Sequence, residues 1–242
     1  FKLFKNDELV PNGFYNKTYN KDDWQDIPVP SNWQFHTDDF PLYTNIIYPY
    51  EINPPFMPKD YNPIGLYHRK FKISKEWNDK EVFIHFGAVN SAFYIWINGV
   101  KVGYSEGSKT PAEFNITKYI NSGTNTIMLQ VIRWSDATYL EDQDFWRLSG
   151  IERDVFLYAQ PKVALRDFFV KTNLSDDLKT SDFNIDINVR NYNPFKSNFA
   201  VQSKLYDSNN KLIKIIKNNI EIESLSSKKV NLNDKIIDPL LW

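Results

Sequence analysis

Residues 181–190 alternate almost perfectly between apolar and polar side chains, with Phe183, Ile185, Ile187 and Val189 falling on one face of an extended chain. A period of two predicts a strand with one face buried. Elsewhere no apolar period of 3.6 residues persists for a full helix, and short apolar runs are separated by Pro, Gly and Asn. The sequence therefore predicts an all-β fold.

The texture of the sequence changes near residue 161, where aromatic residues thin out and Lys, Asn, Asp and Ser increase. A chain of 242 residues with 42% hydrophobic residues exceeds one typical domain, so we expect two, residues 1–160 and 161–242. In the first, residues 82–86 and 92–97 are nearly continuous apolar or aromatic runs, typical of strands covered on both faces. Asn98-Gly99 then predicts a tight hairpin.

In the second domain, apolar runs at residues 164–172, 181–190, 199–206 and 211–216 predict the strands of a sandwich, and residues 207–210 predict a turn. Residues 161–242 number fewer than the roughly 100 that an immunoglobulin-like sandwich usually needs. We therefore expect this sandwich to be truncated. Because the first residues already alternate like a strand, we also expect the chain to be a piece of a larger protein.

Charge and composition exclude several classes of function. A net charge of −1 gives no sign of a basic patch, so we expect no binding to nucleic acid. No apolar run reaches the roughly 20 residues that cross a bilayer, so we expect no membrane partner. Without cysteine there are no disulfides and no thiolate metal sites. The chain is expected to be soluble, in the cytoplasm or a periplasm. His36, His68 and His85 are isolated, and we expect structural roles for them.

Residues 133–155 crowd carboxylates, arginines and aromatic rings into one short segment. Sugars need this mixture, because their hydroxyls bond carboxylates while their C–H faces lie on aromatic rings. The alternative is a buried network of arginines and carboxylates in a β-sandwich. Composition alone favours the network.

Several motifs that occur in a particular order along the chain support the sugar-binding interpretation of residues 133–155. The segment reads W-S-D-x-x-Y-L-E-D-Q-D-x-W-R-x-S-G-I-x-R-D-V from Trp134. Further motifs lie at residues 29–34, 43–45, 53–56, 62–65, 89–99, 102–105 and 111–114. Together they resemble the amino-terminal sugar-binding domain of the large β-galactosidases of glycoside hydrolase family 2, over residues 1 to about 160. Beyond Pro161 the resemblance is one of position and pattern.

The resemblance implies a jelly-roll domain followed by an immunoglobulin-like domain. It places both catalytic glutamates, and a magnesium ion, on a TIM barrel further along the parent chain, with the acid/base in an Asn-Glu dipeptide. No Asn-Glu dipeptide occurs here. Because a glycosidase needs two carboxyl groups across the scissile bond, we expect residues 1–242 alone to be inactive. The parent is expected to hydrolyse terminal β-D-galactosides with retention, as a homo-oligomer.

The resemblance assigns substrate contact to two positions. The sugar-binding asparagine of the Y-T-N motif falls on Asn45, and the sugar-binding aspartate that ends E-D-Q-D falls on Asp144. In the family this aspartate also binds a sodium ion, and a hard cation suits oxygen ligands. Without the resemblance, Asn45 would be interpreted as a turn residue.

Other residues of the segment have structural and functional alternatives. We expect Asp142 and Asp154 to pair with arginines, because bidentate pairing with a guanidinium is common for buried acids. Four aromatic residues could be sugar platforms, although core packing is the stronger expectation for them. They are Phe93, Trp96, Trp134 and Trp146. The proline-rich run 53–63 is either a buttress for Asn45 or, as we expect, a surface that docks against the barrel.

Two alternative functions remain at this point. A jelly roll also serves as a free-standing carbohydrate-binding or assembly module. Related enzymes of the family act on β-glucuronides or β-mannosides, whereas the E-D-Q-D-x-W-R motif favours a galactosidase.

Overall fold

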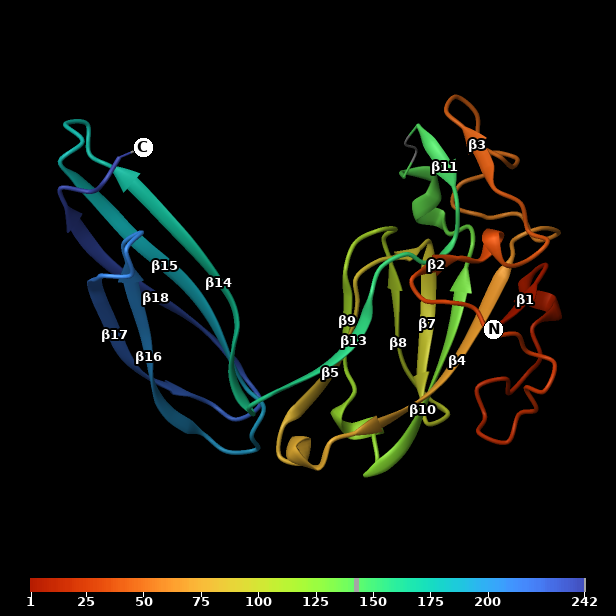
Figure 1. The fold of residues 1–242 in the computed structure, drawn as a ribbon, viewed down its shortest axis with the longest axis horizontal. Helices are drawn as coiled ribbons and strands as arrows, with labels where there is room; N and C mark the ends of the chain where they lie inside the picture. Colours follow the sequence, from red (N-terminus) through yellow and green to blue (C-terminus); the bar gives the residue numbers. More distant parts are fainter. Residues whose placement is uncertain (142–143, 242) are drawn as a thin grey trace. The chain divides into compact units, whose positions relative to one another are not determined.

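The computed structural model describes residues 1–141 and 144–241, and Asp142, Gln143 and Trp242 lie outside the described residues. The chain divides into two compact units, Phe1–Ala159 and Gln160–Trp242 (Figure 1). Each unit consists of antiparallel strands, joined in the first by short 3-10 helices. The described 3-10 helices are η1 (Asp7–Leu9), η2 (Trp33–Phe35), η3 (Lys75–Trp77), η4 (Thr117–Tyr119) and η5 (Asp136–Tyr139). The prediction of an all-β fold is confirmed.

The first unit is a jelly-roll sandwich built around one five-stranded sheet. In order across the sheet, its strands are β1 (Lys2–Phe4), β4 (Ile64–Ile73), β10 (Gly123–Ile132), β7 (Ala92–Ile97) and β8 (Val100–Glu106). A second sheet contains β13 (Val155–Gln160), β5 (Glu81–Phe86) and β9 (Ala112–Asn115). Between the two sheets lies a core of buried apolar side chains from β4, β5, β7 and β10, against which the partly buried Ala112 and Phe114 of β9 pack.

Two smaller sheets complete the first unit. One contains β2 (Ser31–Asn32), β12 (Gly150–Ile151) and β6 (Val89–Asn90). The other is a ribbon of β3 (Leu42–Thr44) and β11 (Phe145–Arg147). In Figure 1 this ribbon stands at one end of the unit, away from the turns that lead from β4 to β5. It therefore presents its tip to the surroundings.

Strand β7 shows why its sequence is nearly continuously apolar. Phe93, Ile95 and Ile97 point into the core between the sheets, whereas Trp96 packs on the other face against Phe14. A central strand with both faces covered has no polar face. The hairpin to β8 also forms as predicted, with positive φ at Asn98 (54°) and Gly99 (85°).

The second unit is a smaller sandwich. One sheet contains β14 (Val163–Leu174), β15 (Thr180–Asn191) and β18 (Ser227–Ile237), and the other contains β16 (Ser197–Tyr206) and β17 (Leu212–Ile222). The apolar positions that alternate along β15 are all buried, at 1–6% exposure. They pack against Val201 and Ile220 of the second sheet. The alternating pattern of residues 181–190 is therefore confirmed as a half-buried strand.

The core face of β14 is open. Phe168 lies opposite Ile187 and Val170 lies opposite Ile185, so these residues share the face that β15 turns toward the core. Yet Phe168 is 65% exposed and Val170 is 44% exposed. Within the described residues the two-stranded sheet thus leaves the core face of β14 accessible.

Among the described residues, no helix has the length and apolar character required to pass through a lipid bilayer.

Candidate sugar-binding site

The ribbon of β3 and β11 brings the two predicted sugar-binding residues to one place. Thr44 pairs with Phe145, and Tyr43 pairs with Trp146. Asn45 follows Thr44 and Asp144 precedes Phe145, so both residues lie at the open end of the ribbon. Both are exposed. Two segments about a hundred residues apart in the sequence therefore present an amide and a carboxylate to the same surroundings.

Asp144 has a partner within the ribbon. The Tyr43 hydroxyl donates a hydrogen bond to Oδ1 of Asp144. This hydrogen bond raises the pKa of the Tyr43 hydroxyl, so Tyr43 stays a donor at neutral pH. The contact orients the carboxylate, and among the described residues no hydrogen bond to Oδ2 is formed, so this oxygen can accept one from a ligand.

The described residues provide only part of the ligand set that a sodium ion would need. The Asp144 carboxylate is a hard oxygen ligand of the kind such an ion prefers. Within residues 1–141 and 144–241, however, no group of three or more His, Cys, Asp or Glu side chains is arranged to hold a metal. The Asp144 carboxylate could supply one ligand to a cation, and the remaining ligands would have to come from elsewhere, so the sodium site stays a prediction.

Of the four aromatic residues expected to pack in the core, Trp146 is the one that the structure exposes. Phe93, Trp96 and Trp134 are buried, with 2–6% exposure, as predicted. Trp146 is 55% exposed, so core packing was the wrong prediction for this residue. Its ring lies across the ribbon from Tyr43, with 5.8 Å between the ring centroids. The ribbon is too narrow to bury either ring, and both remain available at the site.

An ion pair in the interior supports the segment that leads into β3. The Arg133 guanidinium donates from Nη1 to Oδ1 of Asp39, and the two side chains are 0% and 1% exposed. Asp39 also accepts from Trp33 Nε1 at 2.6 Å and Gln34 Nε2 at 2.9 Å through Oδ2. The Tyr61 hydroxyl donates to Oδ1. Burial lowers the pKa of Arg133, and the Asp39 charge opposes that effect.

This ion pair corrects the predicted partners of the acidic residues. Asp154 is exposed and forms no ion pair within the described part of the chain, so its expected pairing with an arginine is wrong. Asp142 lies outside the described residues. The buried guanidinium belongs to Arg133, at the end of β10, and its acid comes from a segment 94 positions earlier. Proximity in sequence was therefore a poor guide to the pairing.

The proline-rich run is tied to the segment after β10 at two points. Asn62 Nδ2 donates to the Trp134 carbonyl, and Trp134 N donates to Asn62 Oδ1, both at 2.9 Å. Further along, the Tyr139 hydroxyl accepts from Asn53 N at 3.1 Å and donates to the Phe56 carbonyl at 2.8 Å. The backbone of the run is fixed even though much of its surface is exposed.

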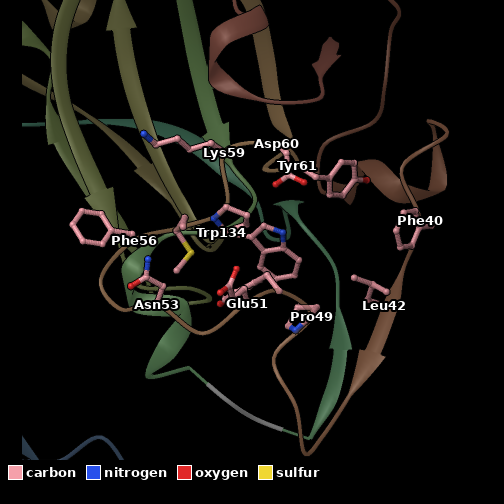
Figure 2. Close-up of a pocket in the computed structure, with 13 residues that line it drawn as sticks. Phe40, Leu42, Pro49, Glu51, Asn53, Phe56, Lys59, Asp60, Tyr61 and Trp134 are labelled. Atoms are coloured by element: carbon pink, nitrogen blue, oxygen red, sulfur yellow. The ribbon is translucent and has the colours of Figure 1, made fainter.

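A cavity of about 520 Å³ opens between this run, the start of β3 and Trp134 (Figure 2). Its wall includes Phe40, Leu42, residues 49–51 that precede the run, and residues of the run from Asn53 to Tyr61. Neither Asn45 nor Asp144 lines it. Whether the run docks against a barrel or buttresses Asn45 stays a prediction.

Two family models match this chain, one for each unit. Residues 1–161 match the family model described as glycosyl hydrolases family 2, sugar binding domain, and residues 163–242 match the model described as glycosyl hydrolases family 2. The chain belongs to glycosyl hydrolase family 2. Its first unit is thus a sugar-binding domain of that family, and its second unit corresponds to the second family model.

Curated relatives of this family 2 chain are named β-galactosidases. One from Priestia megaterium is 41% identical over 247 residues, which cover 100% of this chain and 24% of that protein. One from Vibrio cholerae is 48% identical over 174 residues, 72% of this chain and 17% of that protein. The match thus spans about a sixth to a quarter of the length of such relatives.

Solved structures show the same fold. Bacteroides uniformis β-glucuronidase 2 superposes with a TM-score of 0.79 at 22% identity, covering 100% of this chain and 27% of that chain. A β-glycosidase from Bacteroides vulgatus superposes with a TM-score of 0.69 at 21% identity, covering 100% and 29%.

Two residues of the site were missed by sequence reasoning. Tyr43 is the first letter of the Y-T-N motif, and strand alternation alone places it on the same face as Asn45. Its contact with Asp144 required only the pairing of β3 with β11. No local sequence pattern marks Asp39 as a buried acid, because two of its hydrogen-bond donors, Tyr61 and Arg133, lie far away in the sequence. The other two donors are Trp33 and Gln34.

Proposed function

We propose that this chain is the non-catalytic amino-terminal part of a retaining β-galactosidase, to which it contributes substrate-binding residues. The observation that carries the proposal is the ribbon of β3 and β11, which places Asn45 and Asp144 at one open end. The curated relatives at 41–48% identity, all named β-galactosidases, support the choice of substrate. The terminal galactosyl group would bind at this end of the ribbon.

The chemistry of the two side chains suits a sugar. A carboxylate accepts hydroxyl protons, and an amide both donates and accepts. Asp144 is held by Tyr43, so its orientation is set before a sugar arrives. The exposed Trp146 ring beside Tyr43 offers an apolar face for sugar C–H groups.

The proposal includes a sodium ion at Asp144, with its other ligands supplied outside the described residues. A cation there would neutralise the carboxylate charge and help to orient a bound hydroxyl. It also includes both catalytic glutamates and magnesium on a barrel outside residues 1–242, and a homo-oligomeric parent. Without the catalytic carboxylates, residues 1–242 should not cleave a chromogenic β-galactoside above the uncatalysed rate.

The test replaces each contact in the longer protein that carries this chain. Asp144→Asn removes a hydrogen bond to a charged group, worth roughly 1.5–3 kcal/mol, so kcat/KM for a β-galactoside should fall at least about tenfold. Asn45→Ala removes a neutral bond worth roughly 0.5–1.5 kcal/mol and should cost less.

Asp154→Asn is the matched control, because Asp154 is an exposed carboxylate on the same unit. It should leave both kinetics and sodium dependence unchanged. If Asp144→Asn behaves like this control in kinetics and only lowers the melting temperature, Asp144 is structural and the proposal fails.

A further inference from the structure

The loop that follows β8, residues 107–110, supports the chain just before the second strand of the ribbon. The backbone N–H of Ser108 donates a hydrogen bond to Oε1 of Glu141 at 2.7 Å, and a carboxylate acceptor makes such a bond strong. The Glu141 carbonyl in turn accepts from Nη1 of Arg147, on β11, at 2.9 Å. Glu141 stands three positions before Asp144. The side chain and the backbone of Glu141 are therefore both held near the sugar-binding end of the ribbon.

The same loop places a cation against the residue that follows Asp144. The Lys109 ammonium lies 4.5 Å from the centroid of the Phe145 ring, which is a cation–π distance. It also donates to both carboxylate oxygens of Glu152, at 3.3 and 3.1 Å. Glu152 is itself held by Asn32 of β2, whose Nδ2 donates to Oε1 at 3.0 Å. The ammonium is thus fixed at its far end and keeps the Phe145 ring in one place.

The backbone of Lys109 points to a role for its side chain. Its φ is 65°, in the left-handed region that residues other than Gly and Asn adopt rarely. A Gly or an Asn would meet this turn at lower cost, but neither provides a cation for Phe145 and Glu152. A conflict between the local backbone preference and the residue type is typical of functional positions.

Asp144 lies at the open end of a short ribbon, where its position depends on such support. The strand that it precedes, β11, has three residues and pairs with β3 alone in this two-stranded sheet. Two-stranded ribbons are marginally stable by themselves. The Tyr43 hydroxyl holds Oδ1 of the carboxylate, while the loop after β8 holds the chain to either side of it.

We propose that residues 107–110 clamp the sugar-binding end of the ribbon, and that Lys109 and Glu141 are positioning residues that act on the substrate through Asp144. The clamp limits the positions that the carboxylate takes before a galactosyl group arrives, so less conformational entropy is lost on binding. This inference rests on the proposed function, because Lys109 and Glu141 affect catalysis only if Asp144 binds the substrate.

The first experiment measures order at the end of the ribbon by NMR, in the chain by itself and without a ligand. Lys109→Asn removes the cation, while Asn tolerates the left-handed backbone. Relaxation of the backbone amides should show lower order parameters at Asp144 and Phe145. Lys101→Asn is the matched control, because Lys101 also lies over an aromatic ring, that of Tyr94 at 3.8 Å, but at the other end of β8. It should leave the same two amides unchanged.

The second experiment measures kinetics in the longer protein. Lys109→Asn should lower kcat/KM for a β-galactoside about twofold to fivefold, which corresponds to the loss of a partly exposed cation–π contact. Lys109→Arg keeps a cation at this place and should retain most of the activity. Glu141→Ala should also lower kcat/KM, whereas Glu141→Gln keeps an acceptor for Ser108 N and should cost less. Lys101→Asn should have no effect.

A double substitution separates positioning from a general structural role. If Lys109 acts through Asp144, Lys109→Asn should have almost no further effect on kcat/KM once Asp144→Asn has removed the carboxylate charge. A general loss of stability would instead add to the effect of Asp144→Asn. The melting temperatures of all variants are measured alongside.

Two results would overturn the clamp alone. One is an unchanged order parameter at Asp144 and Phe145 in Lys109→Asn, and the other is a kinetic loss in Lys109→Asn that is absent or that adds fully to that of Asp144→Asn. An unchanged kcat/KM in Asp144→Asn by itself would reject the proposed function, and the positioning role with it. The single and double variants thus show which of the two proposals has failed.

Discussion

The Arg133 guanidinium and the Asp39 carboxylate meet in the interior of the first unit, where solvent reaches neither side chain. Asp39 takes hydrogen bonds from four different side chains, including the Tyr61 hydroxyl that fixes one wall of the cavity. The carboxylate thereby connects η2, the start of β3, the end of the proline-rich run and the end of β10. This buried charge pair holds together segments that lead into the ribbon and line the cavity.

Asp39→Asn should be strongly destabilising. It leaves the Arg133 charge buried without its counterion, which costs about 3–5 kcal/mol in the free energy of unfolding. Urea unfolding of residues 1–242, followed by a probe of the first unit, measures the change. Asp39→Asn combined with Arg133→Met should recover part of the loss, because no unpaired charge remains. A loss of less than about 1 kcal/mol for Asp39→Asn would contradict the role of the pair.

Tyr43→Phe should separate orientation of Asp144 from the charge itself. The substitution keeps the ring beside Trp146 and removes the hydroxyl that holds Oδ1. In the longer protein kcat/KM should fall roughly threefold to tenfold, less than for Asp144→Asn, and the sodium concentration for half-maximal activity should rise. Tyr206→Phe, on an exposed tyrosine of the second unit, is the control. An unchanged sodium response would show that Tyr43 does not position the carboxylate.

Glu106→Gln should raise the melting temperature at neutral pH. The hydrogen bond and the charge of Glu106 raise the pKa of Asp136. A carboxyl group with a raised pKa in the folded state adds stability at low pH, and this contribution is lost as the pH rises through that pKa. As the pH rises through that pKa, Asp136 takes on its charge beside the Glu106 carboxylate and the two groups repel each other. The gain from Glu106→Gln should therefore shrink as the solution is acidified, whereas Glu76→Gln should show no such trend.

Because the core face of β14 is open, two apolar side chains on the same face of one sheet should contribute very differently to the free energy of unfolding. Ile187→Ala should cost about 2–5 kcal/mol, as for a buried isoleucine, while Phe168→Ala on the neighbouring strand should cost about 0.5 kcal/mol. Urea unfolding of residues 1–242 compares the two. In the longer protein we expect Phe168→Ala to cost more, because a cover over this apolar face would bury the ring. An equal cost for both substitutions in residues 1–242 would contradict the open face.

Local patterns predicted the parts of this fold that depend on neighbouring residues. The alternation of residues 181–190 gave β15, and Asn98-Gly99 gave the hairpin from β7 to β8. Strand β18 was missed because Val230 and Leu232 stand among Lys, Asn and Asp residues. Lys, Asn and Asp have low β propensity, so they hide the strand pattern. The end of β17 was missed for the same reason, since Lys217, Asn218 and Asn219 interrupt its apolar residues.

In the candidate site, too, some residues could be predicted from the sequence and others could not. Asn45 and Asp144 were found through their motifs, and the ribbon pairing then placed them together. The partner of Arg133 could not be read from the sequence, because a buried charge is satisfied by whichever donor or acceptor the tertiary fold brings near. Asp39 is preceded by Asp38, and nothing in the local pattern distinguishes the buried acid from its neighbour.

The spacing between Asp39 and Arg133 has a consequence for the order of folding. The Asp39 carboxylate leaves the ribosome 94 positions before the Arg133 guanidinium, and β3 and β2 wait longer still for β11 and β12. Closing loops of this length costs entropy that only the finished contacts offset. A nascent chain that has not yet exposed residue 151 therefore carries Asp39 without its cation and β2 and β3 without their partner strands, so the ribbon with Asn45 and Asp144 forms only after these later residues have left the ribosome.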